Sequence, residues 1–334
     1  MVSVEVDIHE AIFKFSGQTE LDTWELTDKA FESAAARYNQ WLIKDFHLSM
    51  QKIRELVDAF PFWQRRKGTG HPPVAERDLM VGYLLRQFFN LAFRQTQGML
   101  TCFCDYFRLQ TVPTHTVLSR KNRTRRWNRI WKRFHRFVLD GLQRRKAIIA
   151  TDASGFSGRK RGWKETPYDH RANQNWVKIH SAIEIGTFLV LNYEFTEPNV
   201  HDSQVFESVW DDIPENVIPI RSLADAAYNG EKCLQAALAH GATPIHGIKK
   251  NAVYLPYPET AHQKLVNFKT HWPNRYQSLY GKRNHAETTF SMIQSRFGYR
   301  IRCRSKMGRQ NEVHSKINAH NIRMLAWLDF QWND

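Results

Sequence analysis

The sequence has 334 residues, of which 42% are hydrophobic and 24% are charged, as expected for a folded globular protein with room for two domains. Lys and Arg outnumber Asp and Glu by 48 to 33, which gives a net charge of +15 and an isoelectric point near 9.7. This charge favours a polyanionic partner, and nucleic acid is the most common one. An anionic membrane surface or an acidic protein would be attracted by the same positive charge.

The four cysteines form neither a CxxC pair nor a disulfide framework, and the histidines show no ligand spacing for zinc. The sequence shows no signal peptide and no apolar run of membrane length, so we expect a cytoplasmic protein.

The N-terminal part has a helical pattern. Residues 27–43 predict a helix with Thr27 as its N-cap, and a mostly apolar core helix is expected to begin near Ala75. Between them, residues 64–73 read as a basic loop.

A helix-turn-helix is predicted at about residues 95–125. Its parts are a helix over residues 96–107, a short turn ending in Pro113, and a basic helix that opens at Thr114 and continues to about residue 145. Such a second helix enters the major groove, where hydroxyl groups meet base edges or phosphates and arginines neutralise the backbone. The candidate DNA contacts are Thr116, Ser119, Arg120 and Arg123. A plain helical hairpin with a solvated basic face explains the same pattern.

From about residue 146 the pattern changes to that of strands. The run KAIIATDAS predicts a strand that stops at Asp152, and residues 176–196 predict a hairpin that turns tightly at Gly186. A helix from Ser203, a strand that ends near Asp225, a helix that stops at Gly241 and a short strand at TPIH follow.

Two aspartates thus end two strands of the expected sheet. Ionised carboxylates are disfavoured in buried strands unless they are paired or bind a metal. At the ends of strands in a mixed sheet they face a shared crevice, which is where ligands bind. The alternative is that Asp152 and Asp225 are turn residues, hydrogen-bonded to nearby backbone.

Residues 280–297 contain no proline and predict one long helix. One face carries Tyr280, Arg283, Glu287 and Gln294, beside an apolar stripe of Phe290, Ile293 and Phe297. Glu287 would complete a set of three oxygen ligands with Asp152 and Asp225, and Mg²⁺ prefers oxygen ligands. Two such ions about 4 Å apart activate a water or a 3′-OH against a phosphodiester. The alternative is a surface helix whose charged residues are solvated.

These motifs resemble those of bacterial and archaeal insertion-sequence transposases of the DDE superfamily, in the broad insertion-sequence-four/five grouping. The resemblance is carried by TDAS at Asp152, LADAAYNG at Asp225 and YGKRNHAETTFSMIQ at Glu287. The family pattern Tyr-x2-Arg-x3-Glu-x6-Lys is matched by Tyr280, Arg283 and Glu287, while Gln294 occupies the position of the lysine. The resemblance covers about residues 75–328.

The resemblance implies an α/β fold, with an RNase H-like mixed-sheet catalytic core at residues 146–334 after an all-helical DNA-binding region at residues 1–145. It implies that Asp152, Asp225 and Glu287 are the catalytic residues and the ligands of Mg²⁺, with Mn²⁺ as a substitute. Tyr280, Arg283 and Gln294 would contact DNA. The expected substrates are the terminal inverted repeats of the element and target DNA, cut and joined by a homodimer at the prokaryotic nucleoid.

Two further expectations concern Asp202 and the segment 159–164, and two other functions remain as alternatives. Asp202 is expected to cap a helix, with a role as a secondary metal ligand as the alternative, and the basic segment 159–164 is expected to lie along DNA or in solvent. The other functions are a DNA-binding relative that no longer cuts, and an RNase H-like nuclease without strand transfer.

Overall fold

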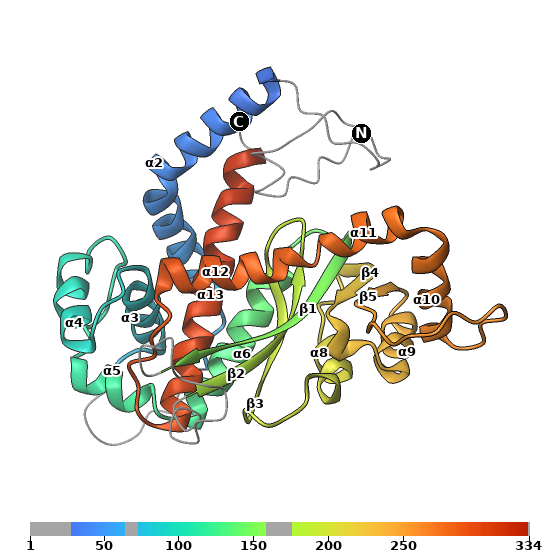
Figure 1. The fold of residues 1–334 in the computed structure, drawn as a ribbon. Coiled ribbons are helices and arrows are strands. Elements are labelled where there is room, and N and C mark those ends of the chain that lie inside the picture. The colour runs from blue at the N-terminus through green and yellow to red at the C-terminus, as the bar shows by residue number, and fades with distance from the viewer. Residues whose placement is uncertain (1–27, 64–72, 158–175, 333–334) are drawn as a thin grey trace, which may run out of the picture. The chain divides into compact units, whose positions relative to one another are not determined.

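The computed structural model describes residues 28–63, 73–157 and 176–332 (Figure 1). Thr27, residues 64–72 and the basic segment 159–164 lie outside this range. The described residues fall into two compact units, each assembled from separate stretches of chain. We call them the sheet unit (within 1–44, 142–155 and 178–291) and the helical unit (within 45–141, 156–177 and 292–334). In the described ranges, no helix is long and apolar enough to cross a membrane.

The sheet unit is built on a five-stranded sheet in the order β3-β2-β1-β4-β5. Its strands are β1 (Arg145–Ser157), β2 (Trp176–Glu184), β3 (Val190–Thr196), β4 (Val217–Ala224) and β5 (Thr243–His246). The predicted hairpin of β2 and β3 is antiparallel, whereas β4 runs parallel to both β1 and β5. The sheet is therefore mixed, and together with the helical N-terminal region it confirms the predicted α/β fold class of an RNase H-like core.

Helices and 3₁₀ turns surround the sheet. They are η1 (Asp202–Gln204), α8 (Phe206–Asp211), η2 (Ala226–Tyr228), α9 (Glu231–Ala239), α10 (Ala261–His271), α11 (Pro273–Gly281) and α12 (Asn284–Phe297). Figure 1 shows α8 and α9 beside β4 and β5. The predicted stop of α9 at Gly241 is confirmed, since this residue has φ +80° directly after the C-cap.

The helical unit contains α3 (Glu76–Phe88), α4 (Phe93–Cys102), α5 (His115–Lys121), α6 (Arg125–Asp140) and α13 (Lys306–Trp332). It also contains α2 (Asp28–Ala59) from Asp45 onwards. Most apolar side chains of α6 are buried, with Trp131 and Phe134 at 0% exposure. The predicted helix at residues 27–43 is the beginning of the longer α2.

The predicted helix-turn-helix has different boundaries in the structure. The first helix ends at Cys102 and not at residue 107, so twelve residues, 103–114, separate α4 from α5 instead of a short turn. Thr114 does cap the second helix, by accepting a hydrogen bond from the Val117 N–H at 3.4 Å. That helix ends after seven residues and does not reach residue 145.

A contact that is distant in sequence explains the early end of α5. The buried Asn122 side chain donates to the carbonyl of Gly308 at 3.2 Å. Asn311 of α13 donates to the Asn122 carbonyl at 2.8 Å, and Thr124 then starts α6 as its N-cap. A local helical pattern contains no information about partners more than 180 residues away.

The C-terminal end of α12 is held by a buried charge network in the helical unit. The Lys316 ammonium donates to the carbonyls of Phe297 and Gly298, the latter at 2.6 Å. Arg86 and Glu312, which are 3% and 2% exposed, form an ion pair at 3.1 Å in the same network. Breaking a buried pair of this kind costs about 3–5 kcal/mol. The network therefore fixes the end of the helix that carries Glu287.

The predicted domain boundary near residue 145 stays a prediction. The two compact units do not follow it at the C-terminus, where residues 292–334 belong with the helical unit. The reason is α13, which packs against α6 and α3.

Candidate active site

Asp152 and Asp225 are neighbours because of the register between β1 and β4. The last paired residues of these parallel strands are Thr151 and Ala224, so each aspartate is the next residue on its strand. Adjacent strands lie about 4.8 Å apart, which brings the two carboxylates to one edge of the sheet. Thr151 is itself fixed, since the indole N–H of Trp210 donates to its hydroxyl at 2.9 Å.

The prediction that the first strand stops at Asp152 was wrong. β1 continues to Ser157, and its last three residues, 155–157, are buried, with Phe156 at 0% exposure. Asp152 therefore lies inside a long strand and only marks the point where the pairing with β4 ends.

The electrostatics of Asp152 show that other site residues lie near it. Burial raises the pKa of Asp152 to about 6. The Ala153 N–H, which donates to this carboxylate at 2.9 Å, and the Arg283 guanidinium lower the pKa, while the charges of Asp225 and Glu287 raise it. The charges of Asp225, at the end of β4, and of Glu287, on α12, thus both reach Asp152 on β1.

The long helix predicted over residues 280–297 is interrupted. α11 ends at Gly281 and α12 begins at Asn284, and the N–H groups of Arg283 and Ala286 bond to carbonyls three residues earlier, in the tighter 3₁₀ manner. Glycine weakens a helix interior by about 1 kcal/mol, which accounts for the position of the break. The apolar stripe is confirmed, with Phe290 at 4% exposure and Ile293 and Phe297 at 0%.

Arg283 and Glu287 remain on one face despite this break. The Arg283 guanidinium donates to Glu287 Oε1 at 2.6 Å, and the Glu287 side chain is 59% exposed. Among the described residues, no hydrogen-bond partner is found for the buried Nε of Arg283. The Nε–H is therefore left unsatisfied inside the described structure.

Tyr280 lies against the loop that carries Asp225. Its ring stacks on Tyr276, with the centroids 5.5 Å apart and the planes at 12°. A Cβ on Gly247 would lie 2.7 Å from both the Tyr280 hydroxyl and the Ala226 backbone nitrogen. Only glycine allows this approach of the tyrosine and the loop after Asp225.

The carboxylates have backbone partners as well. Asp225 accepts a hydrogen bond from the Ala227 N–H at 2.8 Å, as the turn-residue interpretation requires, and Asp152 accepts one from Ala153. Within the described ranges, no group of three or more His, Cys, Asp or Glu side chains is arranged to hold a metal ion. Glu287 would have to leave Arg283 to join the two aspartates.

Asp202 does not cap a helix, contrary to the expectation. His201 is the N-cap of η1, and Asp202 instead forms an ion pair with Lys178 at 2.6 Å. The lysine lies on β2, and sequence spacing alone could not identify it as the partner.

Sequence reasoning missed Tyr228, which lies within the quoted LADAAYNG motif. Its hydroxyl is fully buried and has no hydrogen-bond partner in the described part of the chain. Burial raises its pKa, and so do three nearby carboxylates. These carboxylates are Asp202, Asp152 and Asp225. The signal that could have identified it is a tyrosine three residues after a strand-end aspartate.

The other predicted DNA-contacting residues lie apart from the aspartates in sequence. Gln294 is half-buried on α12, two turns after Glu287. On and beyond α5, Thr116, Arg120 and Arg123 are exposed, and Arg123 donates to the Ser119 hydroxyl at 3.0 Å. Their spacing of three or four residues is that of one helix face.

Comparison with known proteins identifies the family. The family model described as Transposase DDE domain matches residues 143–322, more than half of the chain. The chain belongs to the DDE transposase family. Members are polynucleotidyl transferases that act on DNA and generally use divalent metal ions. The matched range contains Asp152, Asp225 and Glu287. No solved structure matches the chain.

The raised pKa of Asp152 predicts a dependence of stability on pH. An acid whose pKa is raised on folding stabilises the fold when protonated, and this contribution is lost as the pH rises from 3.8 through about 6. In metal-free buffer, the unfolding free energy of Asp152→Asn minus that of wild type should therefore increase by about 2 kcal/mol between pH 4.5 and pH 7.5. Urea denaturation at several pH values measures this difference, in which the titration of all other groups cancels. A difference that does not change with pH would contradict the burial of this carboxylate.

The close approach at Gly247 predicts a second effect. Gly247→Ala should lower the unfolding free energy by about 1–3 kcal/mol, because the new methyl group would overlap backbone and not only a movable side chain. Gly186→Ala is the matched control, since nothing lies within 4 Å of a Cβ built there. Equal effects of the two substitutions in urea denaturation would show that the approach of Tyr280 to this loop is not tight.

Proposed function

We propose that this chain is a DNA transposase that cuts at the terminal inverted repeats of an insertion sequence and joins the freed ends to target DNA. The observation that carries the proposal is the register of Thr151 with Ala224, which sets Asp152 beside Asp225 on neighbouring strands. The family match supports the reaction class, and the electrostatic effect of Glu287 on Asp152 supports Glu287 as the third acid.

The donor set fits a hard divalent cation, and we propose Mg²⁺, with Mn²⁺ as a substitute. Asp152, Asp225 and Glu287 offer only oxygen atoms, and a buried carboxylate whose pKa is raised to about 6 gains most from a nearby cation. When bound, the metal would supply charge stabilisation of the phosphodiester and activation of the attacking oxygen. Glu287 is free to turn towards the aspartates because its side chain is mostly exposed.

Arg283 has two tasks in this proposal. Without DNA it balances the charge of Glu287 and lowers the pKa of Asp152. With DNA bound, its guanidinium, whose side chain is 16% exposed, would donate charge-assisted hydrogen bonds to a phosphate near the cut. Tyr280, held by Tyr276, would contact the same strand, and Gln294 would contact DNA two turns further along α12.

The helical unit would bind the element ends. Exposed Thr116, Arg120 and Arg123 form one face with Ser119, and this face suits contacts to phosphates and base edges. The active assembly would be a homodimer, since an element has two ends and each needs its own site. The protein would then work in the prokaryotic cytoplasm on nucleoid DNA.

Cleavage of labelled duplex with the sequence that flanks the gene tests the proposal. Wild type should cut at the repeat tips in Mg²⁺, leaving 3′-OH ends, and should bind without cutting in Ca²⁺. Asp152→Asn and Glu287→Gln should lose cutting by about 10³-fold or more while they still bind DNA.

The other functions are outcomes of the same assay. Equal binding by folded wild type and variants with no cutting would indicate a DNA-binding relative. Cutting without joining to target DNA would indicate a nuclease. Cutting that survives both substitutions would contradict the site assignment.

A further inference from the structure

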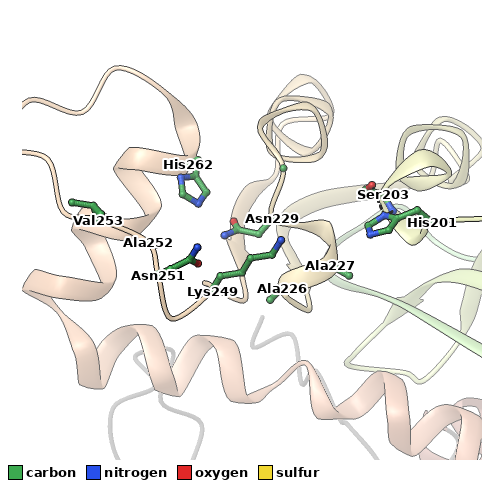
Figure 2. A pocket seen from close by; sticks show the side chains of 11 residues that line it. His201, Ser203, Ala226, Ala227, Asn229, Lys249, Asn251, Ala252, Val253 and His262 are labelled. Carbon is green, nitrogen blue, oxygen red and sulfur yellow. Dashed lines mark hydrogen bonds between the residues drawn. The ribbon is translucent and has the colours of Figure 1, made fainter.

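The sheet unit contains a pocket of about 520 Å³ to which the proposed chemistry gives no role (Figure 2). Its wall begins with Ala226 and Ala227, directly after Asp225. The polar side chains that line it are His201, Ser203, Asn229, Lys249, Asn251 and His262. Figure 2 shows His262 on one side and His201 with Ser203 on the other, with Asn229, Asn251 and Lys249 between them.

The lining has the chemistry of an anion site. It contains a lysine, two histidines, two amides and a hydroxyl, and no Asp or Glu is among the described residues that line it. The Ser203 N–H donates to Nδ1 of His201 at 3.3 Å, so in the neutral imidazole the proton is on Nε2, which is a donor. Donors and positive charge in one cavity select a ligand that is rich in acceptors and negatively charged.

Asn229 provides a second, independent sign of a ligand. Its side chain is 6% exposed, and its Oδ1 has no hydrogen-bond partner among the residues that the structure describes. An unsatisfied amide atom of this kind costs about 1–3 kcal/mol, a cost that a ligand in the pocket would remove. Since the two ends of an amide are exchangeable by rotation, Asn229 can present either its donor or its acceptor.

One helix also begins at the pocket with an uncapped N-terminus. Gly230 lines the pocket, is the N-cap of α9 and has no side chain to cap it. A helix N-terminus carries partial positive charge, which favours anions. The nearby Glu231 carboxylate is already used, since it accepts hydrogen bonds from the N–H groups of Ala261 and His262.

We propose that this pocket binds a backbone phosphate of the DNA strand, adjacent to the phosphodiester that is cut. The inference rests on the proposed function, because the pocket wall starts one residue after Asp225. Lys249 supplies the charge, and Asn229 and His262 supply hydrogen bonds.

The surroundings of the pocket fit a nucleic acid strand better than a free phosphate. The loop that contributes Lys249 and Asn251 continues to Tyr254 and Tyr257, which are 40% and 90% exposed. Exposed aromatic rings beside lysines are a common platform on which bases of a strand stack. A strand whose phosphate occupies the pocket would have its bases within reach of these rings.

Lys249→Met tests the proposal, with Lys250→Met as the matched control. Both lysines are exposed and carry the same charge, but only Lys249 lines the pocket. Binding to the flanking duplex in Ca²⁺ would be measured by fluorescence anisotropy over a range of salt concentrations. Lys249→Met should make the slope of log Kd against log salt shallower by about 0.9, the value for one phosphate, and Lys250→Met should change it much less.

Asn229→Ala tests the pocket without changing its charge. It should weaken binding several-fold at every salt concentration and leave the slope unchanged, because it removes a hydrogen bond and no charge. Duplexes with one neutral methylphosphonate linkage then locate the phosphate. Wild type should lose affinity at one linkage beside the cut, and Lys249→Met should be insensitive to that same linkage.

The outcomes separate this inference from the proposed function. Equal slopes for Lys249→Met and Lys250→Met, in a protein that still cuts the repeat tips, would overturn the pocket assignment alone. A phosphate contact at Lys249 in a protein that never cuts would support the pocket and overturn the transposase chemistry. A wild type that binds no duplex would overturn both, and inhibition by inorganic phosphate without any methylphosphonate effect would reassign the pocket to a free anion.

Discussion

The candidate site depends on the placement of Asp152 and Asp225 side by side at one edge of the sheet. The parallel register of Thr151 with Ala224 imposes this arrangement, and Trp210 holds Thr151 in place. Two carboxylates so close together oppose folding, and burial raises the pKa of one of them to about 6. A fold selected for stability alone would place apolar residues at these positions. The opposing charges therefore indicate a function that needs them, and divalent metal chemistry on DNA is the one that the family supplies.

Positive charge around this edge offsets part of the repulsion. Arg283 pairs with Glu287 and also acts on Asp152, while the buried Lys316 network fixes the far end of the helix that carries Glu287. Within the sheet unit, the pocket with Lys249 adds positive charge beyond Asp225. The exposed arginines near α5 belong to the helical unit. These positive groups suit a polyanionic substrate, in agreement with the net charge of +15.

The parts of this account that were predictable from sequence are those set by local pattern. The β-branched, strand-like pattern of the sequence located β1, β4 and β5. The spacing of Phe290, Ile293 and Phe297 identified the buried face of α12. Distant contacts were not predictable. The end of α5 depends on the bond of Asn122 to Gly308, and Asp202 pairs with Lys178 on β2. The pocket was missed for the same reason, since Asn229, Lys249 and His262 meet only after β5 and α10 are in place.

Crystals soaked with Mn²⁺ and measured at the manganese absorption edge test most directly whether Asp152, Asp225 and Glu287 together hold a divalent ion. Anomalous scattering locates the ion without any assay of cutting. We expect a manganese peak between the carboxylates of Asp152 and Asp225, within about 2.2 Å of their oxygens, with Glu287 turned away from Arg283 to join them. A fully soaked crystal in which Mn²⁺ binds elsewhere, while Glu287 stays on Arg283, would contradict the proposed metal site.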